Sequence, residues 1–349
     1  MNSLSSHCPP LVIYLFRQKS VTSRWLLNGV LTVAVGLFGL FFNVHSALMI
    51  RNFKIRKTLL VLLTVLASCN ASVTLSSLGL YSITEALQPF LGKPRVTQIV
   101  TQLFYPISNI SMTATVWMIV VITLHRYHAV INPLTHRITD TMRRTNLITS
   151  TVLICSVIYC VPTFFELEIL ECHVVSNWSR ISVSYAWATA LRQNGWYLLI
   201  YCSLLNGLFV TVGPFFLITI ASVRMVFLVK RANAYRAQTQ SNRYGPVRKY
   251  QTTGMLLAVT SKFLVSNLMQ IVLNTWETMH PEINESQLFS LLVDLSNFLV
   301  VLNAATDSLV YFRWRTTMSK KNHHATLMVS LARVPRCRSS TISRLRVNA

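Results

Sequence analysis

The sequence predicts an all-α membrane protein built as a bundle of seven transmembrane helices. Only 12% of its 349 residues are charged and 52% are hydrophobic, whereas about 25% of the residues in soluble domains are charged. Apolar runs recur seven times along the chain, and each approaches or exceeds the roughly 20 residues that a helix needs to cross a bilayer. These runs cover residues 25–50, 58–81, 98–124, 147–165, 197–227, 252–276 and 288–312.

The distribution of charge predicts which way the helices cross the membrane. Of the 32 lysines and arginines, 24 fall on one side, in residues 51–57, 126–144, 224–249 and 313–349, together with the acid Asp140. Basic loops mark the cytoplasmic face, so we expect the N-terminus outside, the tail inside, and a multi-pass protein of the plasma membrane. The net charge of +22 flanks lipid-spanning segments, which disfavours nucleic acid as a partner.

Three segments divide the chain. Residues 1–24 are an extracellular N-terminus whose apolar run, LVIYLF, is too short for a signal peptide. Residues 25–312 form the seven-helix domain. Residues 313–349 form a short amphipathic eighth helix on the inner membrane surface and a basic Ser/Thr tail. The glycosylation triplets at Asn177 and Asn284 both fall in outside loops, in agreement with this topology.

Polar residues within the predicted helices indicate an internal network. Asn43 lies in the first helix, Asn70 in the second, and Asn303 and Asp307 in the seventh. Polar groups in hydrocarbon are costly and normally pair inside a bundle, and residues four apart share a helix face. For Asn43, a plain packing contact between helices is an equally good interpretation, whereas a carboxyl group in mid-bundle favours a function.

The third helix ends in a polar cluster at the membrane boundary. Residues 110–124 carry no charge, and His125, Arg126 and Tyr127 then follow together. An arginine there either extends to the lipid headgroups or meets a partner that offers hydrogen-bond acceptors. The pattern of the whole chain favours the second interpretation.

The outside loop and the fifth helix each carry one feature. Residues 166–194 form a long loop that contains Cys172, and Cys8 is the other clearly extracellular cysteine, so these two could pair. Pro214 lies within the fifth helix and is expected to kink it, because proline removes one backbone hydrogen bond.

The chain resembles a rhodopsin-like G-protein-coupled receptor over about residues 25–320. Residues 104–134, FYPISNISMTATVWMIVVITLHRYHAVINPL, are similar to the third helix of invertebrate FMRFamide-type neuropeptide receptors. The resemblance implies a heterotrimeric G protein as the inside partner and a peptide as the outside ligand. It also implies a set of activation-switch residues, which are His125, Arg126, Tyr127, Asn43, Asn70, Asn303, Asp307 and Tyr311.

Several positions depart from the family pattern. His125 stands where an acid usually precedes the arginine, Asn70 stands where an aspartate is usual, and Asp307 with Ser308 replaces the usual Asn-Pro. The sixth helix has Met269 in place of its proline. These changes put the family's activation control and sodium pocket in doubt. Without an acid beside Arg126, we expect high agonist-independent signalling, lowered by His125→Asp and abolished by Arg126→Ala.

Helical spacing, together with the helix arrangement that the resemblance implies, predicts a ligand site in the outer half of the bundle. Residues three, four and seven apart share a face, and such stripes occur near the outer ends of the third, sixth and seventh helices. The predicted ligand-binding residues are Tyr105, Ser108, Asn109, Met112, Gln270, Asn274, Glu277, Asp294 and Asn297. By resemblance, Ser108 and Val301 disfavour an amine or retinal ligand. Glu277, Asp294 and the loop glutamates suit a basic, amidated peptide.

Two other classes of protein stay open. A channel or transporter would need a polar path, for which Asn70, Lys262 and Asp307 are candidates. A non-signalling peptide binder would keep the fold and lose the switch. The sequence contains no convincing catalytic, metal or cofactor constellation, so we expect neither an enzyme nor a cofactor.

Overall fold

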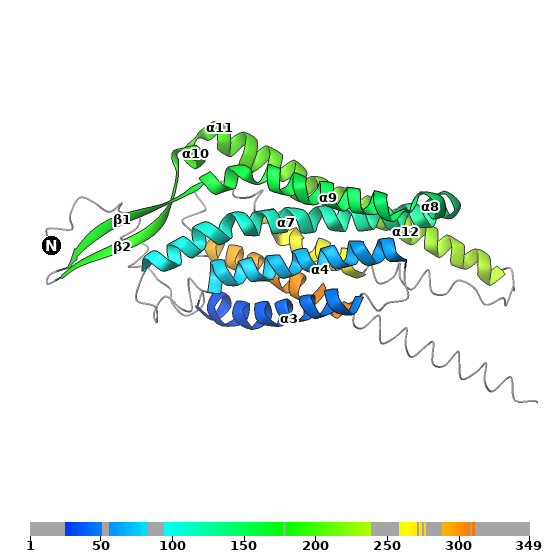
Figure 1. Ribbon diagram of the computed structural model, residues 1–349, viewed down its shortest axis with the longest axis horizontal. Helices are drawn as coiled ribbons and strands as arrows, with labels where there is room; N and C mark the ends of the chain where they lie inside the picture. The colour runs from blue at the N-terminus through cyan, green and yellow to red at the C-terminus, as the bar shows by residue number, and fades with distance from the viewer. Residues whose placement is uncertain are drawn as a thin grey trace, which may run out of the picture.

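The computed structural model describes residues 25–50, 56–82, 94–176, 179–238, 258–270, 272–273, 276, 288–307 and 309–310. Six helices in this part are long and apolar enough to cross a membrane, and they run side by side in an elongated bundle (Figure 1). The six are Leu26–Met49, Lys57–Ser82, Val96–Ile131, Met142–Phe165, Gly195–Arg231 and Leu288–Asp307. The expected sixth span, residues 252–276, is described only in part and is helical over residues 258–270.

Most crossings contain more than one helical segment. The first two consist of η1 (Trp25–Leu31) with α3 (Thr32–Ile50), and α4 (Lys57–Ser77) with η2 (Leu78–Ser82). The third is α7 (Pro94–Ile131), which leads into the loop helix α8 (Pro133–Thr139), and the fourth is α9 (Met142–Tyr159) with η3 (Val161–Phe165). The fifth follows α10 (Ala190–Gln193) and consists of α11 (Gly195–Tyr197), η4 (Leu198–Leu205), η5 (Gly207–Val212) and α12 (Gly213–Gln238).

The third helix extends beyond its apolar run at both ends. It continues to Ile131, so the polar cluster at 125–127 lies on a regular helix rather than in a turn. Pro133 does not simply end the segment, because it begins α8 at the first helical position, where its fixed backbone angle suits a helix start. The end of the third helix and α8 therefore lie close together on the cytoplasmic side.

The outside loop contains a β-hairpin that the sequence analysis did not predict. Strands β1 (Leu167–Ser176) and β2 (Ser179–Ala188) pair antiparallel, at the end of the bundle opposite α8 (Figure 1). The base of the hairpin is attached to the third helix. Gln102 Nε2 donates to the carbonyl of Leu167 at 3.0 Å, and the Ala186 amide donates to Gln98 Oε1 at 3.0 Å.

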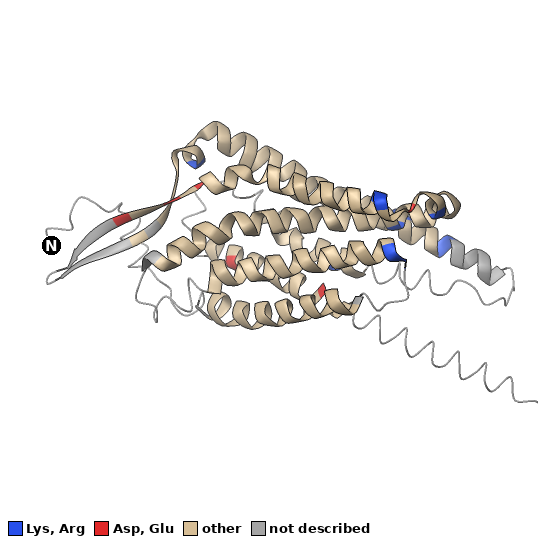
Figure 2. Ribbon diagram, in the orientation of Figure 1, with Lys and Arg blue, Asp and Glu red and all other residues tan. Residues whose placement is uncertain are grey.

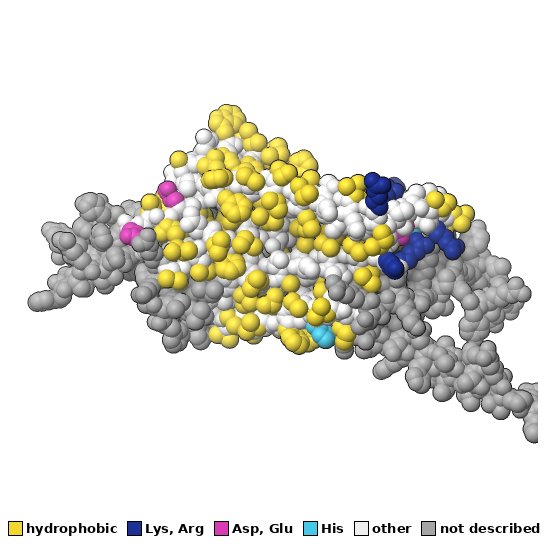
Figure 3. Space-filling model, viewed as in Figure 1, with side chains coloured by type: hydrophobic (Ala, Val, Ile, Leu, Met, Phe, Trp, Pro, Cys, Tyr) yellow, Lys and Arg dark blue, Asp and Glu magenta, His cyan; other side chains and the backbone are white. Residues whose placement is uncertain are grey.

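The interior is centred on the second and third helices. Leu62, Leu66, Met118 and Ile122 are buried and pack into one apolar cluster with Ile218 of the fifth helix. The outside of the bundle is apolar as well, with side chains such as those of Phe41 and Leu204 exposed by 64% and 63%. Figure 3 shows hydrophobic side chains spread over the surface between the two ends, and Figure 2 shows most of the described Lys and Arg at the α8 end. A belt of this kind is expected to face lipid.

Two close approaches of the backbone depend on glycine. A Cβ at Gly39 would overlap Ala305 of the seventh helix, and a Cβ at Gly213 would overlap the carbonyl of Leu208. The second contact lies at the junction of η5 and α12, directly before Pro214. A wide π-helical turn is a known way to accommodate a proline within a helix. At Pro214, where a kink was expected, the fifth helix has the π-helical segment η5 directly before α12.

Candidate functional site

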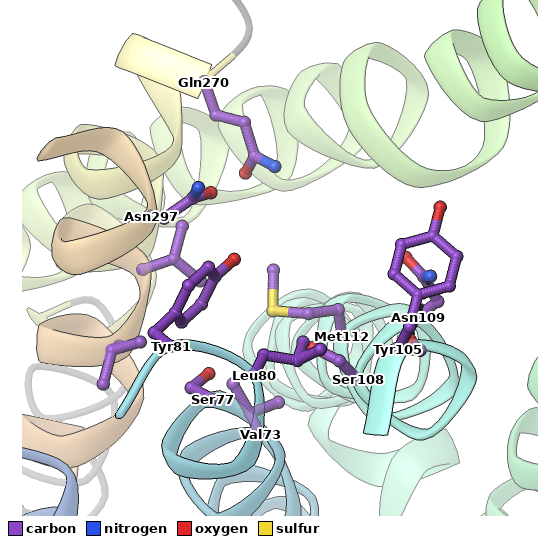
Figure 4. Close-up of a pocket in the computed structure, with 12 residues that line it drawn as sticks. Val73, Ser77, Leu80, Tyr81, Tyr105, Ser108, Asn109, Met112, Gln270 and Asn297 are labelled. Carbon is purple, nitrogen blue, oxygen red and sulfur yellow. Dashed lines mark hydrogen bonds between the residues drawn. The ribbon is translucent and has the colours of Figure 1, made fainter. Parts of the chain in front are cut away.

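A cavity of about 170 Å³ opens among the second, third, sixth and seventh helices. Figure 4 shows Gln270 and Met112 pointing toward one another across it, with Tyr81 on one side and Tyr105 on the other. The predicted ligand-binding residues that the structure brings together here are Tyr105, Ser108, Asn109, Met112, Gln270 and Asn297. The third, sixth and seventh helices therefore each contribute predicted residues to one cavity.

The second helix contributes to the cavity, and the sequence analysis missed this contribution. Val73, Ser77, Leu80 and Tyr81 line one wall. Asn70, Val73, Ser77 and Tyr81 are spaced by three and four residues, so a stripe on this helix offered the same signal that identified the other walls. Val300 and Val301 complete the apolar lining from the seventh helix.

The acidic residues of the predicted site are placed only in part. Asp294 is half-buried and interacts electrostatically with Tyr81 of the cavity wall, although it does not itself line the cavity. Asn274 and Glu277 lie outside the described residues. Of the two acidic residues predicted for the ligand site, Glu277 and Asp294, the structure thus describes only Asp294.

Glu166 joins the third, fourth and fifth helices at the outer end of the bundle. Its side chain is 2% exposed and forms an ion pair with Arg192. The hydroxyls of Tyr105 and Tyr197 donate to its two carboxylate oxygens, each at 2.7 Å. The interpretation that the loop glutamates await a basic ligand is therefore wrong for Glu166, because internal donors already occupy this carboxylate.

A polar network crosses the centre of the bundle. Asn70 Nδ2 donates to Asp307 Oδ2 at 2.8 Å, and Lys262 Nζ lies 2.6 Å from Asp307 Oδ1. Lys262 also donates to the Asn303 carbonyl at 2.7 Å and to Thr306 Oγ1 at 2.9 Å. The network joins the second, sixth and seventh helices, and Lys262 and Thr306 are members that were not predicted as part of it.

The first helix is joined to the seventh by a separate contact. Asn43 is fully buried, and its Nδ2 donates to the Ala304 carbonyl at 2.9 Å. The bond lies one residue from the close contact between Gly39 and Ala305. Asn43 therefore holds two closely packed helices together, as the packing interpretation of this residue expected.

An acid that the sequence analysis did not connect with the switch lies beside His125. Asp140 Oδ1 is 3.1 Å from His125 Nε2, and Asp140 Oδ2 accepts from Arg56 at 3.0 Å and from Thr58 at 2.8 Å. Among the described residues, the buried Nε of Arg126 has no hydrogen-bond partner. The acid in this cluster therefore hydrogen-bonds to His125, the residue before the arginine. Tyr127 is half-buried on the same helix.

The remaining predictions fall outside the described residues. These include Tyr311 at the end of the seventh helix, the glycosylation positions Asn177 and Asn284, and Cys8. Cys172 lies on strand β1, but its side chain is not described. The expected eighth helix after residue 312 also lies outside.

Comparisons with known proteins agree with the architecture. Residues 44–311 match the family of 7 transmembrane receptors (rhodopsin family). The chain is 27% identical over 288 residues to the FMRFamide receptor of Drosophila melanogaster, and the match covers 81% of this chain and 50% of that receptor. It is 26% identical over 217 residues to the FMRFamide peptide receptor frpr-18 of Caenorhabditis elegans. This match covers 61% of the chain and 48% of that receptor. The matched region thus spans half or less of the length of these relatives.

Proposed function

Since the chain belongs to the rhodopsin family of seven-transmembrane receptors, we propose that it is a G-protein-coupled receptor for a basic, amidated neuropeptide of the FMRFamide type. The observation that carries the proposal is the cavity at the outer end of the bundle, lined by predicted ligand-binding residues. Both relatives described above are named as FMRFamide receptors. The receptor would transmit binding of the peptide to a heterotrimeric G protein at the α8 end.

The cavity suits one end of a peptide rather than a whole ligand. Its volume of about 170 Å³ is below the roughly 300–1,000 Å³ of pockets that enclose drug-sized molecules. Met112, Val300 and Val301 offer apolar contacts to an aromatic side chain, and the amides of Gln270 and Asn297 offer partners for a terminal amide. The peptide's arginine, one position before the end that enters the cavity, would lie nearer to the outer opening of the bundle. An acidic side chain of the receptor is needed there to bind it.

Asp294 is the described acid in position to bind that arginine. We expect Asp294→Asn to weaken the response to an amidated Arg-Phe peptide by about 5- to 150-fold, because a lost charge-assisted contact costs about 1–3 kcal/mol. The measurement is the concentration of peptide that gives half-maximal second-messenger output in cells expressing the full chain.

A neutral analogue of the peptide supplies the matched control. A peptide with citrulline in place of arginine should be weak on the original receptor and no weaker on Asp294→Asn, because the two changes remove the same contact. If both peptides lose potency equally on the variant, Asp294 does not bind the arginine. If a library of amidated peptides gives no response at confirmed surface expression, the proposed function is wrong.

We also expect high agonist-independent signalling. An acid beside the arginine normally restrains it, and here the carboxylate of Asp140 contacts His125, Arg56 and Thr58 instead. Loss of about 1–3 kcal/mol of restraint would raise the active population by about 5- to 150-fold. Second-messenger output without ligand, measured at matched surface expression, should be well above that of untransfected cells and should disappear in Arg126→Ala.

The variant that restores restraint must allow for Asp140. His125→Asp alone would place two carboxylates together, since His125 Nε2 is 3.1 Å from Asp140 Oδ1, and like charges at that distance repel. His125→Asp combined with Asp140→Asn avoids this and should lower the basal output. Basal output equal to that of untransfected cells would contradict the expectation and favour a non-signalling binder.

The channel interpretation gains no support from the central network. Asn70, Lys262 and Asp307, which were the candidates for a polar path, contact one another. The contacts join three helices across the bundle, which favours a structural or switching role over conduction.

A further inference from the structure

Two histidines and an aspartate converge at the cytoplasmic end of the third helix. Asp140 Oδ1 lies 3.1 Å from His125 Nε2, and Asp140 Oδ2 lies 3.5 Å from His136 Nε2. One ligand atom from each of the three residues lies within 4.8 Å of the others. The side chains are 16%, 10% and 2% exposed for His125, His136 and Asp140. The cluster is therefore largely shielded from solvent and joins α7 to the end of α8.

The geometry points to a metal site: we propose that His125, His136 and Asp140 bind a divalent ion of the Zn²⁺ type at the cytoplasmic end of the bundle. Tetrahedral Zn²⁺ holds imidazole nitrogen and carboxylate oxygen at about 2.0–2.2 Å, which places neighbouring ligand atoms roughly 3.3 Å apart. The nitrogen–oxygen distances, 3.1 Å from His125 to Asp140 Oδ1 and 3.5 Å from His136 to Asp140 Oδ2, bracket that value. Three protein ligands leave the fourth position to water, so the site does not need a further side chain.

The surroundings of His136 prepare it as a ligand. Its second ring nitrogen, Nδ1, lies 3.4 Å from Nδ1 of His128, and a partner on the second nitrogen orients an imidazole toward a metal.

One neighbouring cation competes with the metal. Arg56 Nη1 lies 3.0 Å from Asp140 Oδ2, and Thr58 donates to the same oxygen at 2.8 Å. The Arg56 side chain is 49% exposed, so it can rotate into solvent when an ion enters. Arg56 and the metal should therefore exclude one another, which predicts that removing the guanidinium strengthens metal binding.

The experiment is a calorimetric titration with Zn²⁺ alone. The sample is the purified full-length protein in lipid nanodiscs. We expect one ion bound per protein at this site, with affinity at least about 10-fold weaker in His125→Asn and in His136→Asn. His45→Asn, which removes an exposed histidine of the first helix, should leave the affinity unchanged. Arg56→Gln should tighten it, because the competing charge is gone.

The Arg56 variant keeps the test decisive even if a histidine variant folds poorly, since Arg56 is half exposed and its replacement leaves the three ligands in place. Zn²⁺ should also raise the thermal unfolding temperature of the original protein and of Arg56→Gln, because an ion that binds only the folded state stabilises it. Equal Zn²⁺ affinity in both histidine variants and the original protein would overturn the proposal. So would an Arg56→Gln variant that binds Zn²⁺ no more tightly.

Discussion

Replacing Lys262 with methionine should destabilise the protein by about 3–5 kcal/mol, because it leaves a buried charge without its partner. Asp307 has a side chain that is 1% exposed and lies 2.6 Å from the Lys262 ammonium group. Methionine keeps the length of the side chain and removes the cation. The measurement is thermal unfolding of the detergent-solubilised protein, read together with surface expression in cells.

Replacing Asp307 instead of Lys262 should destabilise the protein less. In Asp307→Asn, Lys262 keeps its bonds to the Asn303 carbonyl and Thr306 Oγ1, and its side chain is less buried than that of Asp307, at 26% against 1% exposed. The double variant Lys262→Met with Asp307→Leu removes both charges and should recover much of the lost stability. If Lys262→Met unfolds at the same temperature as the original protein, the ion pair does not stabilise the bundle.

Replacing Glu166 with glutamine should loosen the outer end of the receptor and greatly weaken its response to peptide. The carboxylate accepts from Tyr105 and Tyr197 and pairs with Arg192. A hydrogen bond to a charged group contributes about 1.5–3 kcal/mol, and glutamine cannot satisfy all three donors. Tyr105 also lines the cavity. Losing its hydrogen bond to Glu166 should therefore change the position of a side chain in the candidate ligand site.

Hydrogen exchange of β1 and β2 measures this effect without any ligand. The Glu166 backbone carbonyl also accepts from the Thr189 amide at 3.0 Å, so the residue lies where the hairpin meets the helices. Amides of both strands should exchange faster in Glu166→Gln. Glu168→Gln, two residues further on and exposed, is the matched control and should exchange like the original protein. Equal exchange in the two variants would show that Glu166 does not hold the hairpin.

Hydropathy was sufficient to predict the six membrane-spanning helices that the structure describes, because a segment in lipid must satisfy its own backbone hydrogen bonds. Spacing predicted several residues that line the cavity, such as Ser108 and Met112, although Asp294 of the predicted set does not line it. Both signals are local, and they depend on side chains a few residues apart on one helix.

The contacts that were missed connect distant parts of the chain. Asn70 and Asp307 are 237 residues apart, and His125 on α7 is 15 residues from Asp140, which follows the end of α8. Asp140 was recognised as the one acid in a basic region, but nothing in its neighbourhood along the chain indicated that α8 would return it to the third helix. The hairpin was also missed, and its attachment to α7 through Gln102 and Gln98 joins residues 65 and 88 apart in the chain.

The ion pair in the centre of the bundle has an electrical consequence for a protein that lies across a charged membrane. A full charge that crosses the membrane exchanges about 2.3 kcal/mol with each 100 mV of potential. Lys262 and Asp307 carry opposite charges 2.6 Å apart, so the potential performs almost no net work when the pair moves as a unit. The pair places two ionised groups within the bilayer without making the central network a voltage sensor.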